Sequence, residues 1–163
     1  MTMDFKGLYE FHGHRCPMST MGARLGNAAM SALGVTKADQ FRIKGMYTAK
    51  NCALDGIQYV TGCTLGNGNL EFTETGAPSL VLARRDGRKS VTVTPSEGAM
   101  ERFSGHKKLR AELEPEREIS GLARAMEIDA LLKAKFDALV EWVQSAPDNE
   151  LVDVAGENTG GDR

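Results

Sequence analysis

The sequence lacks any hydrophobic segment that could cross a membrane. A transmembrane helix needs about 20 consecutive apolar residues, whereas the nearest apolar stretch, residues 78–83, is short and mixed. The first residues also lack the apolar core of a secretory signal, because an acidic residue already stands at Asp4. We therefore predict a cytoplasmic protein without a membrane segment.

An excess of positive charge is also absent. The chain has 20 basic and 22 acidic residues, which give a formal net charge of −2 at pH 7. Such a chain has no basic field that would concentrate DNA or RNA around it. We therefore expect no nucleic-acid partner.

Cysteine is scarce. The three cysteines are an odd number at irregular spacing, which argues against a disulfide framework and for reduced thiols that bind a metal or react. A single bridge between Cys52 and Cys63 is the alternative that the spacing leaves open.

Length and composition are those of an ordinary globular domain. A chain of 163 residues with 41% hydrophobic residues can bury a core of its own. We predict one domain over residues 1–147, because a polar, acidic segment follows Pro147. Residues 148–163 are predicted to form a flexible polar tail.

Two helices are predicted in the first part of the chain. Residues 17–33 place apolar side chains on one helical stripe. Pro17 suits the first helical position and Gly34 suits the C-terminal cap. Residues 52–60 fit a short helix that begins with a cysteine.

Strands are predicted on both sides of the short helix. The segment from Phe41 to Tyr47 alternates between inward and outward residues, as a strand with one buried face does. The pair Asp86-Gly87 is a strong signal for a two-residue hairpin turn. The other predicted strands are residues 70–73, 79–83 and 90–94.

Long helices are predicted for residues 97–146, with breaks near Pro115 and Gly121. The second helix carries a broad apolar stripe that could cover the sheet or pair with a second copy of the chain. This order predicts an α+β fold, with a mixed or antiparallel sheet, an N-terminal helix, a short cysteine helix and long C-terminal helices. The stripe consists of Ile128, Leu131, Leu132, Phe136, Leu139, Val140 and Val143.

A first group of metal-ligating residue types lies before the N-terminal helix. His12, His14 and Cys16 fall within five positions, in a segment expected to be extended or turning, so their side chains could converge. Imidazole and thiolate ligands suit zinc, nickel, copper or ferrous iron, and are poor ligands for magnesium or calcium. His106 is expected to be a surface histidine outside this site.

A second group lies on and after the short helix. Cys52, Asp55 and Gln58 follow a spacing of three residues, which puts them on one side of that helix. An exposed polar helix face is the structural alternative. Cys63 follows in the glycine-rich segment TGCTLGNGN.

The glycine-rich segment is not a nucleotide-binding loop. It lacks the Lys-Ser/Thr ending of a phosphate loop, and Glu71 stands where a third glycine of GxGxxG would be. Gly66 and Gly68 permit sharp turns and the close approach of a ligand. The structural alternative is a tight connection between the helix and the next strand.

The two groups together resemble a known family. FHGHRCP at residues 11–17 and CALDGIQYVTGCTLGNGNL at residues 52–70 are similar to the patterns HGHxCPG, CxxDAIQ and TGCTxGxGNL of the FmdE family, which is named after a component of formylmethanofuran dehydrogenase. The match extends over roughly the first 95 residues, with the motifs in the same order. This chain departs from the pattern at Met18, Lys50, Asn51 and Gly56.

The resemblance implies an α+β core, a homodimer that is often intertwined, and an association with molybdenum or tungsten formylmethanofuran dehydrogenase operons. It implies a core-only member, because no cysteine-rich zinc finger follows Cys63. It does not imply one settled reaction. The site positions that it carries over are His12, His14, Cys16, Cys52, Asp55, Gln58 and Cys63.

Our leading hypothesis is therefore a transition-metal protein, with zinc preferred and nickel or iron as alternatives. The predicted metal ligands are His12, His14, Cys16, Cys52 and Cys63, in a pocket that could also bind a small molecule or cofactor. Cys52 and Asp55 are the predicted catalytic residues, and Gln58, Gly66 and Gly68 the predicted cofactor-binding residues. The alternatives are a metal-independent thiol enzyme with a Cys/His pair, and a non-catalytic accessory or metal-delivery protein.

Overall fold

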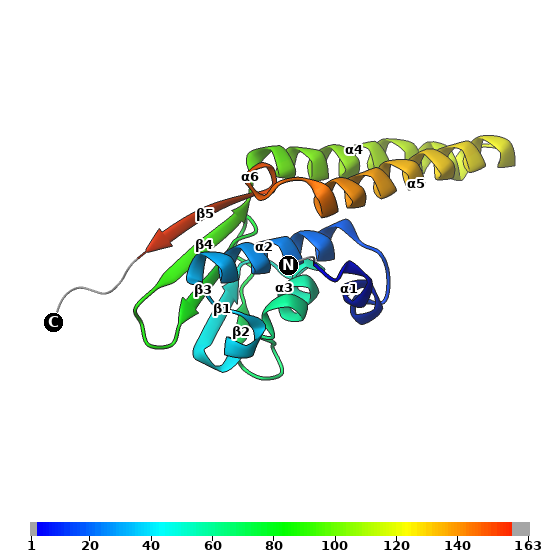
Figure 1. Ribbon diagram of the computed structural model, residues 1–163. Coiled ribbons are helices and arrows are strands. Elements are labelled where there is room, and N and C mark those ends of the chain that lie inside the picture. The colour runs from blue at the N-terminus through cyan, green and yellow to red at the C-terminus, as the bar shows by residue number, and fades with distance from the viewer. Residues whose placement is uncertain (1–2, 158–163) are drawn as a thin grey trace.

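A computed structural model describes residues 3–157 of the chain. It contains a five-stranded sheet, helices packed on that sheet, and a long antiparallel pair of helices that extends away from it (Figure 1). In the part of the chain described, no helix is both long enough and apolar enough to cross a membrane. The predicted α+β class, with an N-terminal helix and long C-terminal helices, is confirmed.

Helix α2 (Pro17–Leu33) is the central element. It packs against α3, against the sheet and against α5, and most of its residues are buried. Pro17 stands at its start, where the missing backbone N–H costs no hydrogen bond. Gly34 ends it in the left-handed conformation at φ 65°. The predicted bounds of this helix are confirmed.

The sheet is mixed. Its strand order is β2-β1-β3-β4-β5, and only the β1–β2 pair is parallel. Arg84 and Lys89 flank the turn between β3 and β4, so the predicted hairpin is confirmed. The strands are β1 (Ile43–Tyr47), β2 (Leu70–Phe72), β3 (Leu80–Arg84), β4 (Ser90–Pro95) and β5 (Val152–Glu157).

The first strand begins later than the alternation predicts. A 3₁₀ helix, η1 (Lys37–Arg42), occupies the start of the expected strand. Thr36 and Asp39 form a reciprocal capping box that stabilises this turn. Phe41 is therefore 71% exposed and does not share the buried face of β1.

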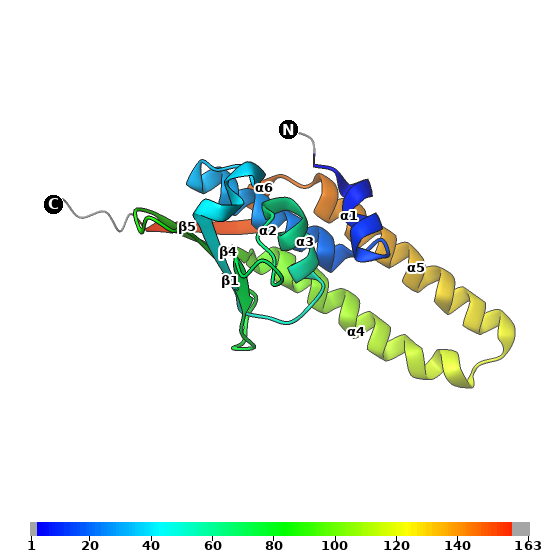
Figure 2. The ribbon, with the colours of Figure 1, turned by 90° about the horizontal axis from the view of Figure 1, so that it is seen from below.

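The long helices are α4 (Glu97–Ile119) and α5 (Leu122–Ser145), which form an arm seen in Figures 1 and 2. The break predicted at Gly121 is present, but the break predicted near Pro115 is wrong, because Pro115 lies inside α4. The turn after Pro115 is held across the hairpin by ion pairs of Arg117 with Asp129 and of Arg124 with Glu116.

The stripe on α5 is only partly buried. Four of its seven residues are buried and Leu131 is 42% exposed. The buried members lie mainly in the half of α5 nearest the sheet, since the other half extends past it (Figure 2). The buried residues are Ile128, Leu139, Val140 and Val143.

The segment after Pro147 is ordered, in contrast to the predicted flexible tail. It forms a short helix, α6 (Asp148–Leu151), and then β5, which pairs antiparallel with β4. Arg24 holds this segment: its buried guanidinium donates hydrogen bonds to carbonyls at the end of α5 and to the Asp148 carboxylate. The polar composition hid both elements. Residues 158–163 of the predicted tail lie outside the described range.

Candidate metal centre

A short helix that the sequence analysis missed carries the first residue of the site. Helix α1 (Phe5–His12) begins where the Asp4 carboxylate accepts a hydrogen bond from the backbone N–H of Gly7. It packs on α3 (Ala53–Thr61) and ends at Gly13, whose φ of 91° reverses the chain. His12 is therefore the last residue of a helix and not part of an extended segment.

The two cysteines of the site stand at helix N-termini. Cys16 immediately precedes α2, as the sequence predicts, and Cys52 immediately precedes α3. The Cys16 carbonyl accepts hydrogen bonds from the hydroxyls of Ser19 and Thr20, which fix the first turn of α2. The turn before α3 is fixed by Asn51, whose side-chain oxygen accepts from the backbone N–H of Ala53.

Two glycines let the helices approach each other closely enough to bring these cysteines together. A Cβ on Gly56 of α3 would lie 2.0 Å from the carbonyl oxygen of Ser19, and a Cβ on Gly22 of α2 would lie 2.0 Å from that of Ala53. Helix backbones therefore touch where only glycine fits.

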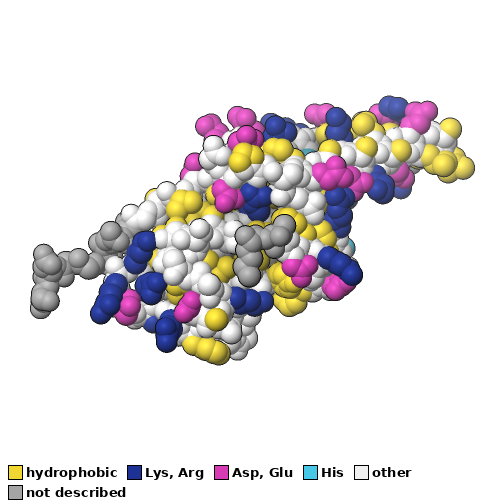
Figure 3. All heavy atoms as spheres, viewed as in Figure 1, with side chains coloured by type: hydrophobic (Ala, Val, Ile, Leu, Met, Phe, Trp, Pro, Cys, Tyr) yellow, Lys and Arg dark blue, Asp and Glu magenta, His cyan; other side chains and the backbone are white. Residues whose placement is uncertain are grey.

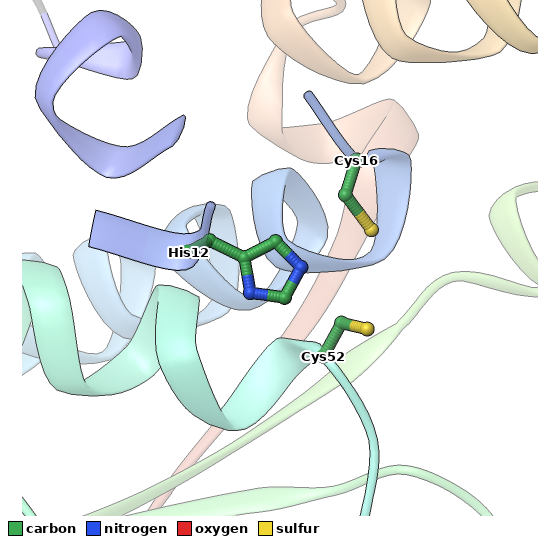
Figure 4. Close-up of side chains that lie close together, drawn as sticks. All are labelled: His12, Cys16 and Cys52. Atoms are coloured by element: carbon green, nitrogen blue, oxygen red, sulfur yellow. The ribbon is translucent and has the colours of Figure 1, made fainter. Parts of the chain in front are cut away.

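The side chains of His12, Cys16 and Cys52 meet at one point. Their ligand atoms all lie within 4.8 Å of one another, and the imidazole points between the two thiols in Figure 4. Ligand atoms of a tetrahedral zinc ion are roughly 3.5–3.8 Å apart when the Zn–S bond is about 2.3 Å and the Zn–N bond about 2.0 Å. Small side-chain rotations of about 1 Å would thus suffice to bind zinc.

The hydrogen bonding of His12 fits a metal ligand. Its Nδ1 lies 2.7 Å from a carboxylate oxygen of Asp55, while its Nε2 is buried without a hydrogen-bond partner. A buried polar atom without a partner is costly, and a metal ion would satisfy it. Histidine ligands of metals commonly donate their other N–H to a carboxylate in this way.

Asp55 and Gln58 belong to the support of His12. The Gln58 amide donates to the second oxygen of Asp55 at 3.2 Å, and its own oxygen accepts from the backbone N–H of Leu65 at 3.0 Å. This chain of hydrogen bonds orients the imidazole from the glycine-rich loop. Their predicted catalytic and cofactor-binding roles stay predictions.

The electrostatics favour a cation between the thiols. Burial raises the pKa of Cys52, and the neighbouring Cys16 and Asp55 raise it further because each would place negative charge beside a Cys52 thiolate. A bound divalent ion would reverse this penalty and deprotonate the thiols.

Cys63 does not join this group within the chain. It lies beyond the C-terminal end of α3, whereas Cys52 lies before its N-terminal end, and nine helical residues span about 13.5 Å. Its fully buried side chain packs in the core, near the carbonyl of Gln40 at 3.9 Å, and burial raises its pKa. The predicted five-ligand set therefore divides.

His14 is an exposed neighbour of the site. Its ring lies 4.4 Å from that of His12, centroid to centroid, but it is not one of the three converging ligands. Gly66 and Gly68 are exposed in a loop that Asn67 and Thr64 hold by mutual side-chain hydrogen bonds. Their predicted part in cofactor binding stays a prediction.

All three cysteines have free thiols. The alternative bridge between Cys52 and Cys63 is therefore absent, which agrees with their placement at opposite ends of α3.

The third histidine was misjudged as a surface residue. His106 lies on α4, half-buried against Phe136 of α5, with ring centroids 6.0 Å apart. Its Nε2 is buried and has no hydrogen-bond partner. Its surroundings in the sequence, Ser104, Gly105 and Lys107, are polar or small, so no local signal indicated burial.

The fold and the site together define a class: an α+β domain with a half-buried Cys₂His group at the meeting of three helix ends. The FmdE family model, described as "Molybdenum formylmethanofuran dehydrogenase operon", matches residues 11–153. The chain belongs to this family, as its two motifs indicated.

Two known proteins are similar to this chain. A probable S-adenosyl-L-methionine-binding protein of Archaeoglobus fulgidus is 40% identical over 88 residues, which are 52% of this chain and 24% of that protein. The chain therefore matches about a quarter of that relative's length. The crystal structure of an FmdE-like protein of tungsten formylmethanofuran dehydrogenase from Syntrophus aciditrophicus superposes with a TM-score of 0.59, at 18% identity, over 94% of this chain and 70% of the other. This likeness supports the fold.

Proposed function

We propose that the chain binds one transition-metal ion, preferentially zinc, through His12, Cys16 and Cys52. The observation that carries this proposal is the buried Nε2 of His12, which has no partner and faces two thiols. One nitrogen and two sulfur ligands suit zinc, and three protein ligands leave a fourth position for water or a substrate. Such an ion would act as a Lewis acid or activate a bound water.

Metal analysis of protein purified without added metal tests the proposal. We expect about one zinc per chain, lost in the variants Cys16→Ala, Cys52→Ala and His12→Ala. Matched controls are His14→Ala and Cys63→Ala, which remove the same residue types outside the cluster and should keep the ion. The proposal fails if wild-type protein holds no stoichiometric metal, or if the Cys52→Ala variant holds as much as the controls.

The thiol-enzyme alternative has less support from the site. A nucleophilic cysteine needs a lowered pKa, whereas burial and neighbouring negative charge raise that of Cys52. Alkylation of the metal-free protein should therefore show a slow Cys52, in contrast to the fast reaction of an activated thiolate.

We also propose that two chains form a homodimer through the α4–α5 arm in a reducing, cytoplasmic environment, where the three free thiols would persist. The end of the arm exposes apolar side chains, among them Ile119 at 88%, Leu122 at 79% and Met126 at 62% (Figure 3). Exposed apolar surface of this kind supports a contact between two copies. Light scattering should give a dimer for the wild type and a monomer for Ile119→Glu, and a wild-type monomer at all concentrations would refute the contact.

A small-molecule ligand beside the metal is the remaining part of the proposal. The name of the archaeal relative makes S-adenosyl-L-methionine one candidate. Calorimetric titration of the zinc-loaded protein with this compound tests it directly, and absence of heat at millimolar concentration would exclude it.

A further inference from the structure

A cavity of about 480 Å³ lies between the start of α2 and the α4–α5 arm. Cys16 forms part of its wall, and so do Met18 of α2, Phe103 of α4 and Phe136 of α5. We call it the Cys16–His106 cavity, because His106 lines it on the α4 side. Its volume falls in the range of small-molecule sites, which are roughly 300–1,000 Å³.

The charged residues of this cavity all have one sign. Lys107 and Arg110 line it, and no acidic residue of the described chain does. Arg110 is already paired with Glu114 at 2.6 Å, whereas Lys107 forms no ion pair within residues 3–157. The cavity is therefore suited to an anion, although the chain as a whole is slightly acidic.

His106 offers a hydrogen-bonding group without a partner. Its Nε2 is buried and unsatisfied, which makes it the second such atom of the described residues, after that of the metal ligand His12. Burial lowers the pKa of His106, and the positive charge of Arg110 lowers it further. A neutral imidazole can donate to or accept from a bound ligand through this atom.

We infer that the Cys16–His106 cavity binds an organic anion with an apolar body. The body would lie against Met18, Phe103 and Phe136, and its polar groups would bond His106 and Lys107. Because Cys16 belongs to both the cavity wall and the metal group, a molecule bound here lies next to the ion. This inference rests on the proposed function only for that last step.

A second copy of the chain is the competing occupant. The exposed apolar residues that support a dimer contact lie at the far end of the arm, at Ile119 and Leu122, whereas the cavity lies near its base. A cavity that combines cations, an unsatisfied imidazole and a metal-ligating thiol fits a small molecule better than a flat contact between two copies.

Calorimetric titration of the zinc-loaded full chain with octanoate tests the inference, with octylamine and 1-octanol as matched probes of opposite and zero charge. We expect octanoate to bind at least about fivefold more tightly than either. Lys107→Gln should weaken octanoate binding about three- to tenfold, whereas Lys108→Gln, its exposed neighbour outside this cavity, should not. His106→Phe, which keeps a ring but removes the nitrogen, should weaken it about fivefold or more.

A second variant protects the test against misfolding. Ser104→Trp should fill the cavity and abolish binding of all three probes while the circular dichroism spectrum and zinc content stay unchanged. Equal binding of octanoate and octylamine, or equal effects of Lys107→Gln and Lys108→Gln, would overturn the inference. So would octanoate binding that disappears when the chain dimerises, because the cavity would then be covered by a second copy.

The same titration on metal-free protein separates this inference from the proposed function. If zinc is bound stoichiometrically and octanoate is not, the inference alone is wrong. If no zinc is bound but octanoate still discriminates between the lysine variants, the cavity assignment holds and the metal proposal is wrong.

Discussion

The close contact of α2 with α3 leads to our most detailed prediction, the substitution Gly56→Ala. The added Cβ would lie 2.0 Å from the carbonyl oxygen of Ser19 and 2.5 Å from the backbone nitrogen of Ala23. Both are backbone atoms, so the helices must separate by about 1 Å for ordinary contact. Overpacking of this kind costs about 1–3 kcal/mol, and the better helix propensity of alanine returns about 0.5–1 kcal/mol.

We therefore expect Gly56→Ala to lower the stability of the metal-free protein by about 1–2 kcal/mol, or its Tm by roughly 3–6 °C. Because Cys16 and Cys52 begin the two separated helices, zinc affinity should also fall by about tenfold or more. Gly105→Ala is the matched control, since a Cβ there meets nothing within 4 Å inside α4. It should raise stability by about 0.5–1 kcal/mol.

Thermal unfolding and zinc competition titrations measure both effects. If Gly56→Ala is as stable as Gly105→Ala and binds zinc like the wild type, the helix contact does not control the site. A loss of stability with unchanged zinc affinity would refute the link between helix spacing and metal geometry, while leaving the packing account intact.

Three further predictions concern the support of the site and the C-terminal segment. Asp55→Asn should lower zinc affinity about 10- to 100-fold in competition titrations, because the carboxylate orients His12; unchanged affinity would show that Asp55 has no such role. Arg24→Met should cost about 2–4 kcal/mol in chemical denaturation, because three buried carbonyls and Asp148 lose their donor; hydrogen exchange should then rise in β5, and unaltered exchange would contradict the anchoring role. The metal-free protein should lose stability as pH rises above the ordinary cysteine value of 9.0, since Cys52 keeps its proton more tightly when folded; Cys52→Ala should flatten this decline, and an equally steep one would refute it.

Elements with strong local signals were predicted from the sequence. Proline and glycine marked both ends of α2, and the Asp86-Gly87 pair marked the hairpin between β3 and β4. Such signals act within a few residues and so need no tertiary information. The same holds for Cys16, whose place before the first helical turn followed from Pro17.

Elements that depend on distant partners were missed. Strand β5 is stabilised by its pairing with β4 and by Arg24, which acts across more than a hundred residues. Helix α1 is short, contains Gly7, and is held by a contact between Tyr59 and Asp4. Helices of this length are marginal without tertiary packing, so their own residues carry little signal.

The site was predicted in its residue types but not in its membership. Spacing brought His12, Cys16 and Cys52 to attention, and the fold unites them. The same reasoning included Cys63, because a motif of close sequence spacing does not show that a helix separates its two cysteines. Residue spacing in a helix gives direction around the axis, but the distance along it decides which ligands can share one ion.

The departures from the family motifs also acquire a physical explanation. Gly56 stands where alanine is usual, and it is the position where α3 touches the backbone of α2 most closely. Asn51 caps the turn that presents Cys52 and accepts from the hydroxyl of Tyr47 at 3.4 Å. Both departures therefore act on the distance and orientation of the two cysteines, not on the chemical nature of the ligands. Variation of such residues would adjust how tightly a Cys₂His group closes on its ion while its ligands stay the same, and the fourth coordination position would change its shape with them.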